Sequence, residues 1–220
     1  MVKHPASAEL FRQAASAGRT ALTPGELQQL LASLELDPLA DPSADPSADQ
    51  SADWAPDRAR PSAAVELRVS LTRTREFGLV IRAGFGGPAA ELDAGNFTTD
   101  RAVVSAVTDL TDAAGFLALF KRTLPYQMLA GAARRAGASP PDGALEHCFG
   151  KLLALAGSDA QDAAGKPHEL GLLQLDATLA GERLSIQNAR CTFVPRTQGR
   201  LPRPLHKIDK LLHPASIGII

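Results

Sequence analysis

Residues 65–87 read VELRVSLTRTREFGLVIRAGFGG, and this stretch decides the fold. From Val65 to Leu71 every second residue is apolar and the residues between them are polar, which is the period of a half-buried strand. After a charged turn, FGLVI at 77–81 predicts a second strand, so we expect the two strands to form a hairpin. The hairpin is expected to end in the glycine-rich loop AGFGGP at 83–88.

The sequence after the hairpin predicts a strand, two helices and two further strands, at 102–107, 111–120, 141–155, 170–179 and 183–194. The turn between the last two strands is expected at Gly181 and Glu182. This order predicts an α/β fold with a mixed sheet flanked by helices.

The region before the hairpin divides into two parts. Residues 1–36 predict a helical segment, whose second helix starts with the capping box TPGE at 23–26. Residues 37–63 contain an Ala-Asp-Pro-Ser repeat without large apolar side chains, which predicts a disordered linker. Trp54 in this linker is interpreted as an exposed or loosely docked aromatic. The α/β domain is therefore expected at 64–195.

Composition excludes several functional classes. A formal net charge of −1, from 23 Lys+Arg against 24 Asp+Glu, excludes a strongly basic nucleic-acid binder. No apolar run approaches the roughly 20 residues that span a bilayer, and Cys148 and Cys191 have neither disulfide-scaffold nor zinc-site spacing. We expect a cytoplasmic protein without nucleic-acid or membrane partners, and the alanine- and arginine-rich composition is typical of a bacterial source.

Two groups of residues are candidates for ligand binding. The backbone N–H groups of Gly84, Gly86 and Gly87 follow a strand and could hold a phosphate, although no P-loop lysine follows them. A tight turn at the end of the strand explains the same glycines. The second group is a weak metal corner on the last two strands, formed by Gln174, Asp176 and Asn188. Neither group contains a catalytic nucleophile.

A family resemblance rests on several of these motifs in order. ELRV at 66–69, FGLV at 77–80 and the loop GFGG at 84–87 resemble the ATP-grasp region of NDP-forming acyl-CoA synthetases, of the acetate–CoA ligase type related to the succinyl-CoA synthetase β subunit. Leu175-Asp176 and Asn188-Ala189-Arg190 follow in the family's order. KLLHPASI at 210–217 resembles the first strand of the family's CoA-binding domain, so 196–220 is expected to be a linker and the incomplete start of that domain.

The departures from the family matter for function. The resemblance implies a nucleotide-clamp subdomain where the 37–63 linker stands, so the fold is expected to lack that subdomain. It also implies acidic metal ligands where the sequence has Gln174 and Asn188, and loss of these charges weakens binding of a divalent ion. ATP or ADP with Mg²⁺ is therefore a weakly supported ligand, and no cofactor is assigned.

Three hypotheses stay open. The first is a degenerate ATP-grasp-like domain with a structural or docking role that is not competent in ATP hydrolysis on its own. The second is a part of an active acyl-CoA synthetase, an acid–thiol ligase, completed by other domains or subunits. The third is a CoA- or nucleotide-sensing module that uses the 84–87 loop. The expected partners are a further CoA-binding ligase domain or subunit, or a second copy of the chain.

Overall fold

The computed structural model describes residues 5–36, 65–87, 90, 99–161, 167–180 and 183–196. In these ranges the chain forms α1 (Pro5–Ser16), α2 (Pro24–Ser33), β1 (Glu66–Thr74), β2 (Gly78–Phe85), α4 (Thr99–Ala102), β3 (Val103–Val107), η1 (Thr108–Leu110), α5 (Ala113–Phe120), α6 (Leu124–Arg135), α7 (Asp142–Gln161), β4 (His168–Ala180) and β5 (Arg183–Pro195). The expected α/β class is confirmed. The 37–63 linker with Trp54, the turn at 181–182 and the segment 197–220 lie outside the described residues.

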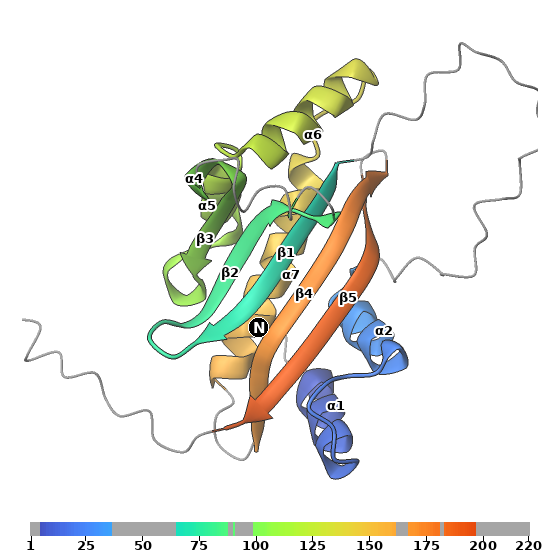
Figure 1. The fold of residues 1–220 in the computed structure, drawn as a ribbon, viewed down its shortest axis with the longest axis vertical. Coiled ribbons are helices and arrows are strands. Elements are labelled where there is room, and N and C mark those ends of the chain that lie inside the picture. Colours follow the sequence, from blue (N-terminus) through green and yellow to red (C-terminus); the bar gives the residue numbers. More distant parts are fainter. Residues whose placement is uncertain are drawn as a thin grey trace, which may run out of the picture.

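Five strands form one sheet in the order β3-β2-β1-β4-β5 (Figure 1). The expected hairpin is present, with Leu71 opposite Ile81, and β4 lies on the other side of β1 with Leu173 opposite Leu71. The sequence predicts a mixture of strand directions, whereas the four pairings in the described sheet are all antiparallel. The difference arises because the helical connection after β3 returns the chain beside β1 in the opposite direction instead of making a parallel crossover.

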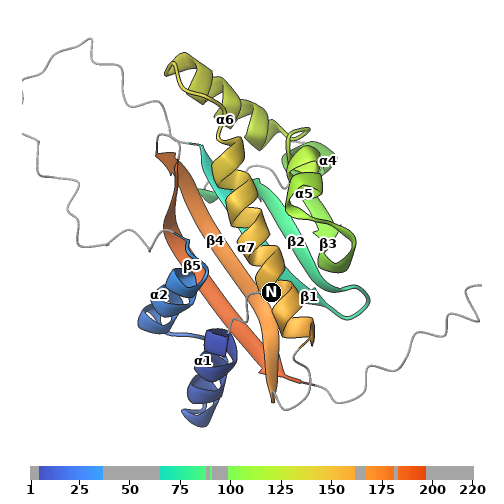
Figure 2. The ribbon, with the colours of Figure 1, turned by 180° about the vertical axis from the view of Figure 1, so that it is seen from behind.

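One face of the sheet is buried by helix α7, which lies along it in Figure 2. The alternate residues Leu67, Val69 and Leu71 of β1 point to this side and are buried, as the sequence pattern predicts. Phe149 of α7 contacts Phe116 and Phe120 of α5 edge-to-face, with ring centroids 4.9 Å and 5.8 Å apart. Apolar contacts of this kind form the core and leave the opposite face of the sheet uncovered by α7.

Helix α6 is not predicted by the sequence pattern. Its buried side consists mainly of small residues, with Leu129, Ala130 and Ala133 turned inward, so its apolar stripe is weak. The helix starts after Thr123, whose hydroxyl donates to the carbonyl oxygen of Phe120 at 2.7 Å. Pro125 stands in its first turn, where a missing N–H costs little.

The two expected N-terminal helices are present and pack beside β5. The Thr23–Glu26 capping box of α2 is formed as predicted, and Arg19 donates to both oxygens of Glu26 at 2.7 and 2.8 Å. The N–H of Leu22 donates to the carbonyl oxygen of Cys191 at 3.1 Å, which fixes the α1–α2 connection to β5. None of the described helices is long and apolar enough to cross a membrane.

Candidate functional site

The sheet face opposite α7, here called the open face, gathers the polar side chains of four strands. In register across the sheet, Gly84 of β2 lies beside Arg68 of β1, then Asp176 of β4 and Asn188 of β5. Paired residues on neighbouring strands point to the same face. The sequence-predicted residues Gly84, Asp176 and Asn188 therefore lie in one row across the sheet.

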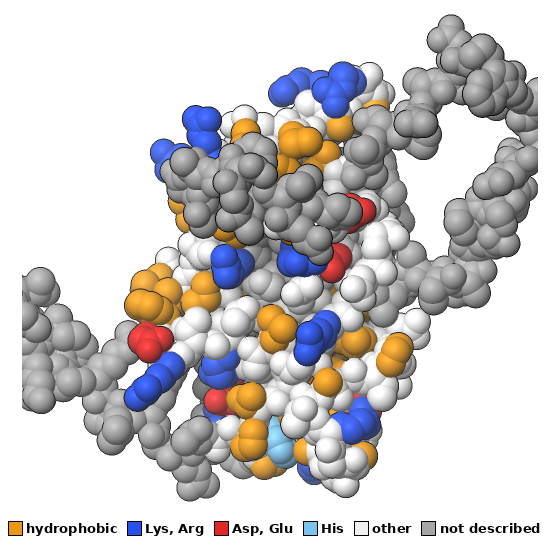
Figure 3. All heavy atoms as spheres, in the orientation of Figure 1, with side chains coloured by type: hydrophobic (Ala, Val, Ile, Leu, Met, Phe, Trp, Pro, Cys, Tyr) orange, Lys and Arg blue, Asp and Glu red, His pale blue; other side chains and the backbone are white. Residues whose placement is uncertain are grey.

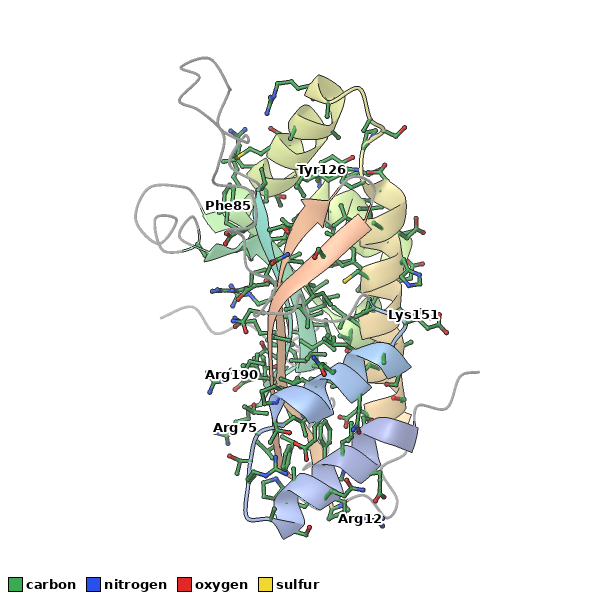
Figure 4. The ribbon with its side chains drawn as sticks, turned by 90° about the vertical axis from the view of Figure 1, so that its right-hand side faces the viewer. Arg12, Arg75, Phe85, Tyr126, Lys151 and Arg190 are labelled. Carbon is green, nitrogen blue, oxygen red and sulfur yellow. The ribbon has the colours of Figure 1, made fainter. Side chains whose placement is uncertain are left out.

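A second row lies next to the first. It runs from Arg82 of β2 through Ser70 of β1 and Gln174 of β4 to Arg190 of β5. Gln174, the remaining residue of the predicted metal corner, is thus a neighbour of Asp176 on the same face. Figure 4 shows Arg190 on the side of the sheet away from α7, and Figure 3 shows Lys and Arg side chains spread over this face.

The charge of Asp176 is already paired within the chain. Nε of Arg68 donates to Oδ1 of Asp176 at 2.6 Å, and Nη2 donates to Oδ2 at 3.3 Å. The side chains are 39% and 16% exposed, respectively, so the pair is partly shielded from water. A two-point guanidinium–carboxylate contact holds both groups in a fixed orientation.

The open face is hollowed by a cavity of about 300 Å³. Its polar lining comes from the three central strands, and consists of Arg68, Ser70, Thr72, Arg82 and Gln174. Gly84, Phe85, Val103 and Leu172 complete it. Two arginines, two hydroxyls and an amide surround this cavity, and no carboxylate is found among its described lining residues. The lining is therefore rich in hydrogen-bond donors and positively charged.

The predicted glycine loop is divided between the strand and its end. Gly84 lies within β2, where a Cβ atom would approach the carbonyl oxygen of Ala102 to 2.8 Å. Gly86 lies just past the strand, and its N–H donates to the carbonyl oxygen of Glu66 at 2.8 Å. Gly87 has φ +53°, and the Glu66 side chain occupies the place of its missing Cβ. Close backbone packing accounts for these glycines, and a phosphate role for them stays a prediction.

No protein-family model matches the chain, and no curated protein matches its sequence. Several solved structures are similar in fold. PH1788 from Pyrococcus horikoshii aligns with a TM-score of 0.61 at 16% identity, over 89% of this chain and 100% of that one. A dinucleotide-forming acetyl-coenzyme A synthetase 1 from Ca. Korarchaeum cryptofilum aligns with a TM-score of 0.60 at 17% identity, over 86% of this chain and 100% of that one. The chain has an ATP-grasp-like fold.

Another structure of the Korarchaeum synthetase, in complex with coenzyme A and Mg-AMPPCP, aligns with a TM-score of 0.58 at 16% identity. These likenesses confirm the fold that the sequence resemblance implies.

The open face does not fit a divalent metal ion. Hard cations such as Mg²⁺ prefer several oxygen ligands, of which carboxylates supply the compensating charge. Here Asp176 is the only carboxylate of the predicted corner, and its two oxygens face the guanidinium of Arg68. Gln174 and Asn188 are neutral amides. Across the described part of the chain, no group of three or more His, Cys, Asp or Glu side chains could hold a metal.

A second cavity, of about 250 Å³, lies on the α7 side of the sheet and is mainly apolar. Its lining includes Leu67, Val69, Leu175, His147 and Cys148. Burial raises the pKa of the Cys148 thiol to about 12, so the thiol is protonated at neutral pH. Nε2 of His147 lies 3.2 Å from the carbonyl oxygen of Glu35. This cavity therefore offers no activated nucleophile.

Sequence reasoning missed the arginines as site residues. Arg68 and Arg82 occupy polar positions of the predicted hairpin, and pairing Ser70 with Arg82 follows once the hairpin register is known. The missing information was the position of β4 beside β1, which brings Asp176 to Arg68. The described side chains that line the open-face cavity are largely polar.

Proposed function

We propose that the chain is a structural and docking module of an acyl-CoA synthetase-like assembly and does not itself carry out magnesium-dependent phosphoryl transfer. The ATP-grasp-like fold supports the assignment to this type of assembly. The observation that carries the non-catalytic role is the contact between Arg68 and Asp176, because it places a fixed positive charge where a metal ion would need a free carboxylate.

The physical argument concerns how phosphoryl transfer is accelerated. The protein contributes mainly positioning and electrostatic stabilisation, and Mg²⁺ neutralises the charge that develops on the phosphate oxygens. Gln174 and Asn188 can accept hydrogen bonds but contribute no negative charge to hold Mg²⁺. A domain with this donor set keeps its fold and its contact surfaces without a positioned metal.

The proposed partner is a CoA-binding ligase domain or subunit. The Korarchaeum synthetase is described in complex with coenzyme A, and its chain aligns over its full length with this one. Cys148 and Cys191 are free and buried, which supports a place in the reducing cytoplasm. Self-association of the chain is a second arrangement that light scattering would detect.

An alternative is that the chain takes part in an active synthetase whose missing groups come from other domains or subunits. The observation in its favour is the full-length alignment with a synthetase that is described with both coenzyme A and Mg-AMPPCP. The two functions differ in one respect that can be measured. Only the alternative requires a magnesium nucleotide to bind this chain productively.

The test is thermal unfolding of the full chain with ATP, in the presence and absence of Mg²⁺. A ligand that binds only the folded state raises the melting temperature. We expect no magnesium-dependent rise. A rise of several degrees that requires Mg²⁺ and ATP together would favour the alternative.

A variant series identifies the cause. Asn188→Asp alone should not create magnesium binding, because Arg68 remains beside Asp176. Combining Asn188→Asp and Gln174→Glu with Arg68→Gln removes the guanidinium and adds two carboxylates, and this triple variant should bind Mg²⁺ measurably by calorimetry. If Asn188→Asp alone bound Mg²⁺ as well as the triple variant, the argument from Arg68 would be wrong.

A further inference from the structure

The open-face cavity has the chemistry of an anion site. Two guanidinium groups, from Arg68 and Arg82, face it together with the hydroxyls of Ser70 and Thr72 and the amide of Gln174. Guanidinium groups match phosphate oxygens with two parallel hydrogen bonds, and hydroxyl and amide donors extend that network. The cavity volume of about 300 Å³ lies at the lower end of the usual small-molecule range, roughly 300–1,000 Å³.

The two arginines differ in how much of their charge is available. Arg68 shares its charge with Asp176 at 2.6 Å. Arg82 is exposed, and none of the described carboxylates lies within ion-pair distance of it. Arg82 therefore supplies positive charge to the cavity that the described residues do not neutralise, and Arg68 supplies a guanidinium already held in place.

We propose that this cavity binds a small phosphorylated anion directly, without a divalent cation, with Arg82 as the main contact and Arg68 as the second. This inference rests on the proposed function, because it takes as its premise that the domain does not position Mg²⁺. In this site Arg82 provides positive charge that Mg²⁺ would otherwise bring, and Arg68 adds a guanidinium whose charge is shared with Asp176.

Direct binding has an unusual consequence for magnesium. Mg²⁺ in solution binds phosphate oxygens and reduces their negative charge, so it competes with the arginines for the same ligand. Mg²⁺ should therefore weaken binding at this site. A site built around a metal ion behaves in the opposite way, because there Mg²⁺ carries the ligand into the site.

The ligand should carry more than a single negative charge. The described lining presents several donors and no carboxylate acceptor, so a tetrahedral phosphate, with its larger number of acceptor oxygens, uses the lining more fully than a carboxylate does. Binding by fixed arginines should also weaken as salt concentration rises. Inorganic pyrophosphate and ADP both carry two linked phosphates and differ mainly in the nucleoside, so comparing them shows whether a nucleoside is recognised.

The experiment is isothermal titration calorimetry of the full chain with pyrophosphate, with ADP and with acetate, at constant ionic strength with EDTA. Pyrophosphate and ADP should both bind, acetate should bind at least tenfold more weakly, and Mg²⁺ in excess over EDTA should weaken the binding of both phosphate ligands. Tighter ADP than pyrophosphate binding would support recognition of a nucleotide, and equal affinities would support recognition of the phosphates alone. Acetate binding as tight as pyrophosphate binding would contradict the proposal.

Variants test the named contacts. Arg82→Ala should weaken pyrophosphate binding at least tenfold, and Arg82→Lys should fall between it and the unchanged chain because it keeps the charge without the planar fork. Arg75→Ala is the matched control, since Arg75 is an exposed arginine in the β1–β2 turn outside the cavity lining, and it should change the affinity less than twofold. If Arg82→Ala and Arg75→Ala lowered the affinity for pyrophosphate equally, overall charge would explain the effect, and the proposed site would be wrong.

Asp176→Asn separates this site from a metal site most sharply. Removing the carboxylate takes a negative charge away from beside the cavity, so pyrophosphate should bind several-fold more tightly, whereas at a metal site the same change abolishes binding. Circular dichroism checks that each variant is folded. If pyrophosphate fails to bind while Mg-ATP also fails, this inference is lost and the proposed function stands. If binding requires Mg²⁺ and is lost in Asp176→Asn, both are wrong.

Discussion

Arg73 of β1 and Asp159 of α7 form a buried ion pair that joins the last turn of the helix to the end of the strand. Nε of Arg73 also donates to the carbonyl oxygen of Leu170 at 2.7 Å, and the Leu170 N–H donates to Asp159 at 3.2 Å. Glu169 lies 3.5 Å from Arg73, and Arg196 lies 3.8 Å from Asp159. Two positive and two negative side chains thus connect α7, β1 and β4 with the residue that follows β5.

Arg73→Met should lower the free energy of unfolding by about 2–4 kcal/mol, because it leaves the Asp159 carboxylate, only 8% exposed, without its main partner. Urea unfolding followed by circular dichroism measures the loss. The double variant Arg73→Met, Asp159→Leu should recover part of it, since no buried charge is left alone. Arg75→Met, in the exposed turn, should change stability by less than about 0.5 kcal/mol. A loss in Arg73→Met as small as in this control would contradict the role of the pair.

Gly86→Ala should destabilise the chain by roughly 1–3 kcal/mol. A Cβ atom at this position would lie 2.7 Å from the carbonyl carbon of Leu67 and 2.8 Å from its oxygen, and neither backbone atom can rotate away. Gly157 of α7 has open space around its Cβ position, so Gly157→Ala should stabilise the helix by up to about 1 kcal/mol. Thermal and urea unfolding of both variants should therefore shift in opposite directions. Two shifts of the same sign would show that close packing is not the reason for Gly86.

Glu26 gives the stability of α2 a defined pH dependence. Hydrogen bonds from Arg19, followed by the backbone N–H of Thr23, lower the pKa of Glu26 from 4.5 to about 2. Since the pKa is lower in the folded state, the stabilisation is present above pH 4.5 and is lost as the pH falls toward 2. Glu26→Gln should cost about 1 kcal/mol near pH 7 and much less near pH 2. Unfolding measured across this range should show the two curves converge, and a constant difference would argue against the ionised carboxylate as the cause.

Tyr126, the only tyrosine in the chain, allows a direct titration. Burial and a hydrogen bond of 2.6 Å from its hydroxyl to Asp142 raise the pKa of Tyr126 to about 12. The midpoint of the phenolate titration, followed by ultraviolet absorbance, should therefore lie about two pH units above the ordinary pKa of 10. Asp142→Asn should move the midpoint down, since it removes the charged acceptor. Exposed Asp109→Asn, in η1, should leave it unchanged, and equal midpoints in the two variants would exclude the Asp142 contact as a cause.

Local patterns in the sequence predict most of the strands and helices. The alternation from Leu67 to Leu71 identifies both the strand and its buried face, and the Thr23–Glu26 spacing identifies the start of α2. The sequence pattern does not predict helix α6, because two of its four buried residues are alanines, and alanine favours helices without indicating a buried face. Strand direction is not predicted either, because it depends on where the long connection after β3 returns to the sheet. No local sequence pattern contains that information.

The candidate site was predictable in part. Gly84, Gln174, Asp176 and Asn188, which the sequence singles out as ligand-binding candidates, lie on one face of the sheet. The contact of Asp176 with Arg68 joins residues that are 108 positions apart, and it follows only from the pairing of β1 with β4. That Arg68 neutralises the candidate metal ligand Asp176 cannot be recognised until the positions of the strands are known.

The α1–α2 connection has a consequence for solubility. The carbonyl of Thr20 and the N–H of Leu22 hydrogen-bond to Phe193 and Cys191, so they saturate part of the outer backbone of β5. An exposed edge strand presents unpaired backbone N–H and C=O groups, to which strands of other molecules can add and begin aggregation. The α1–α2 connection therefore protects part of the β5 edge from pairing with other molecules. A version of the chain shortened to the sheet and α7 would lose this protection.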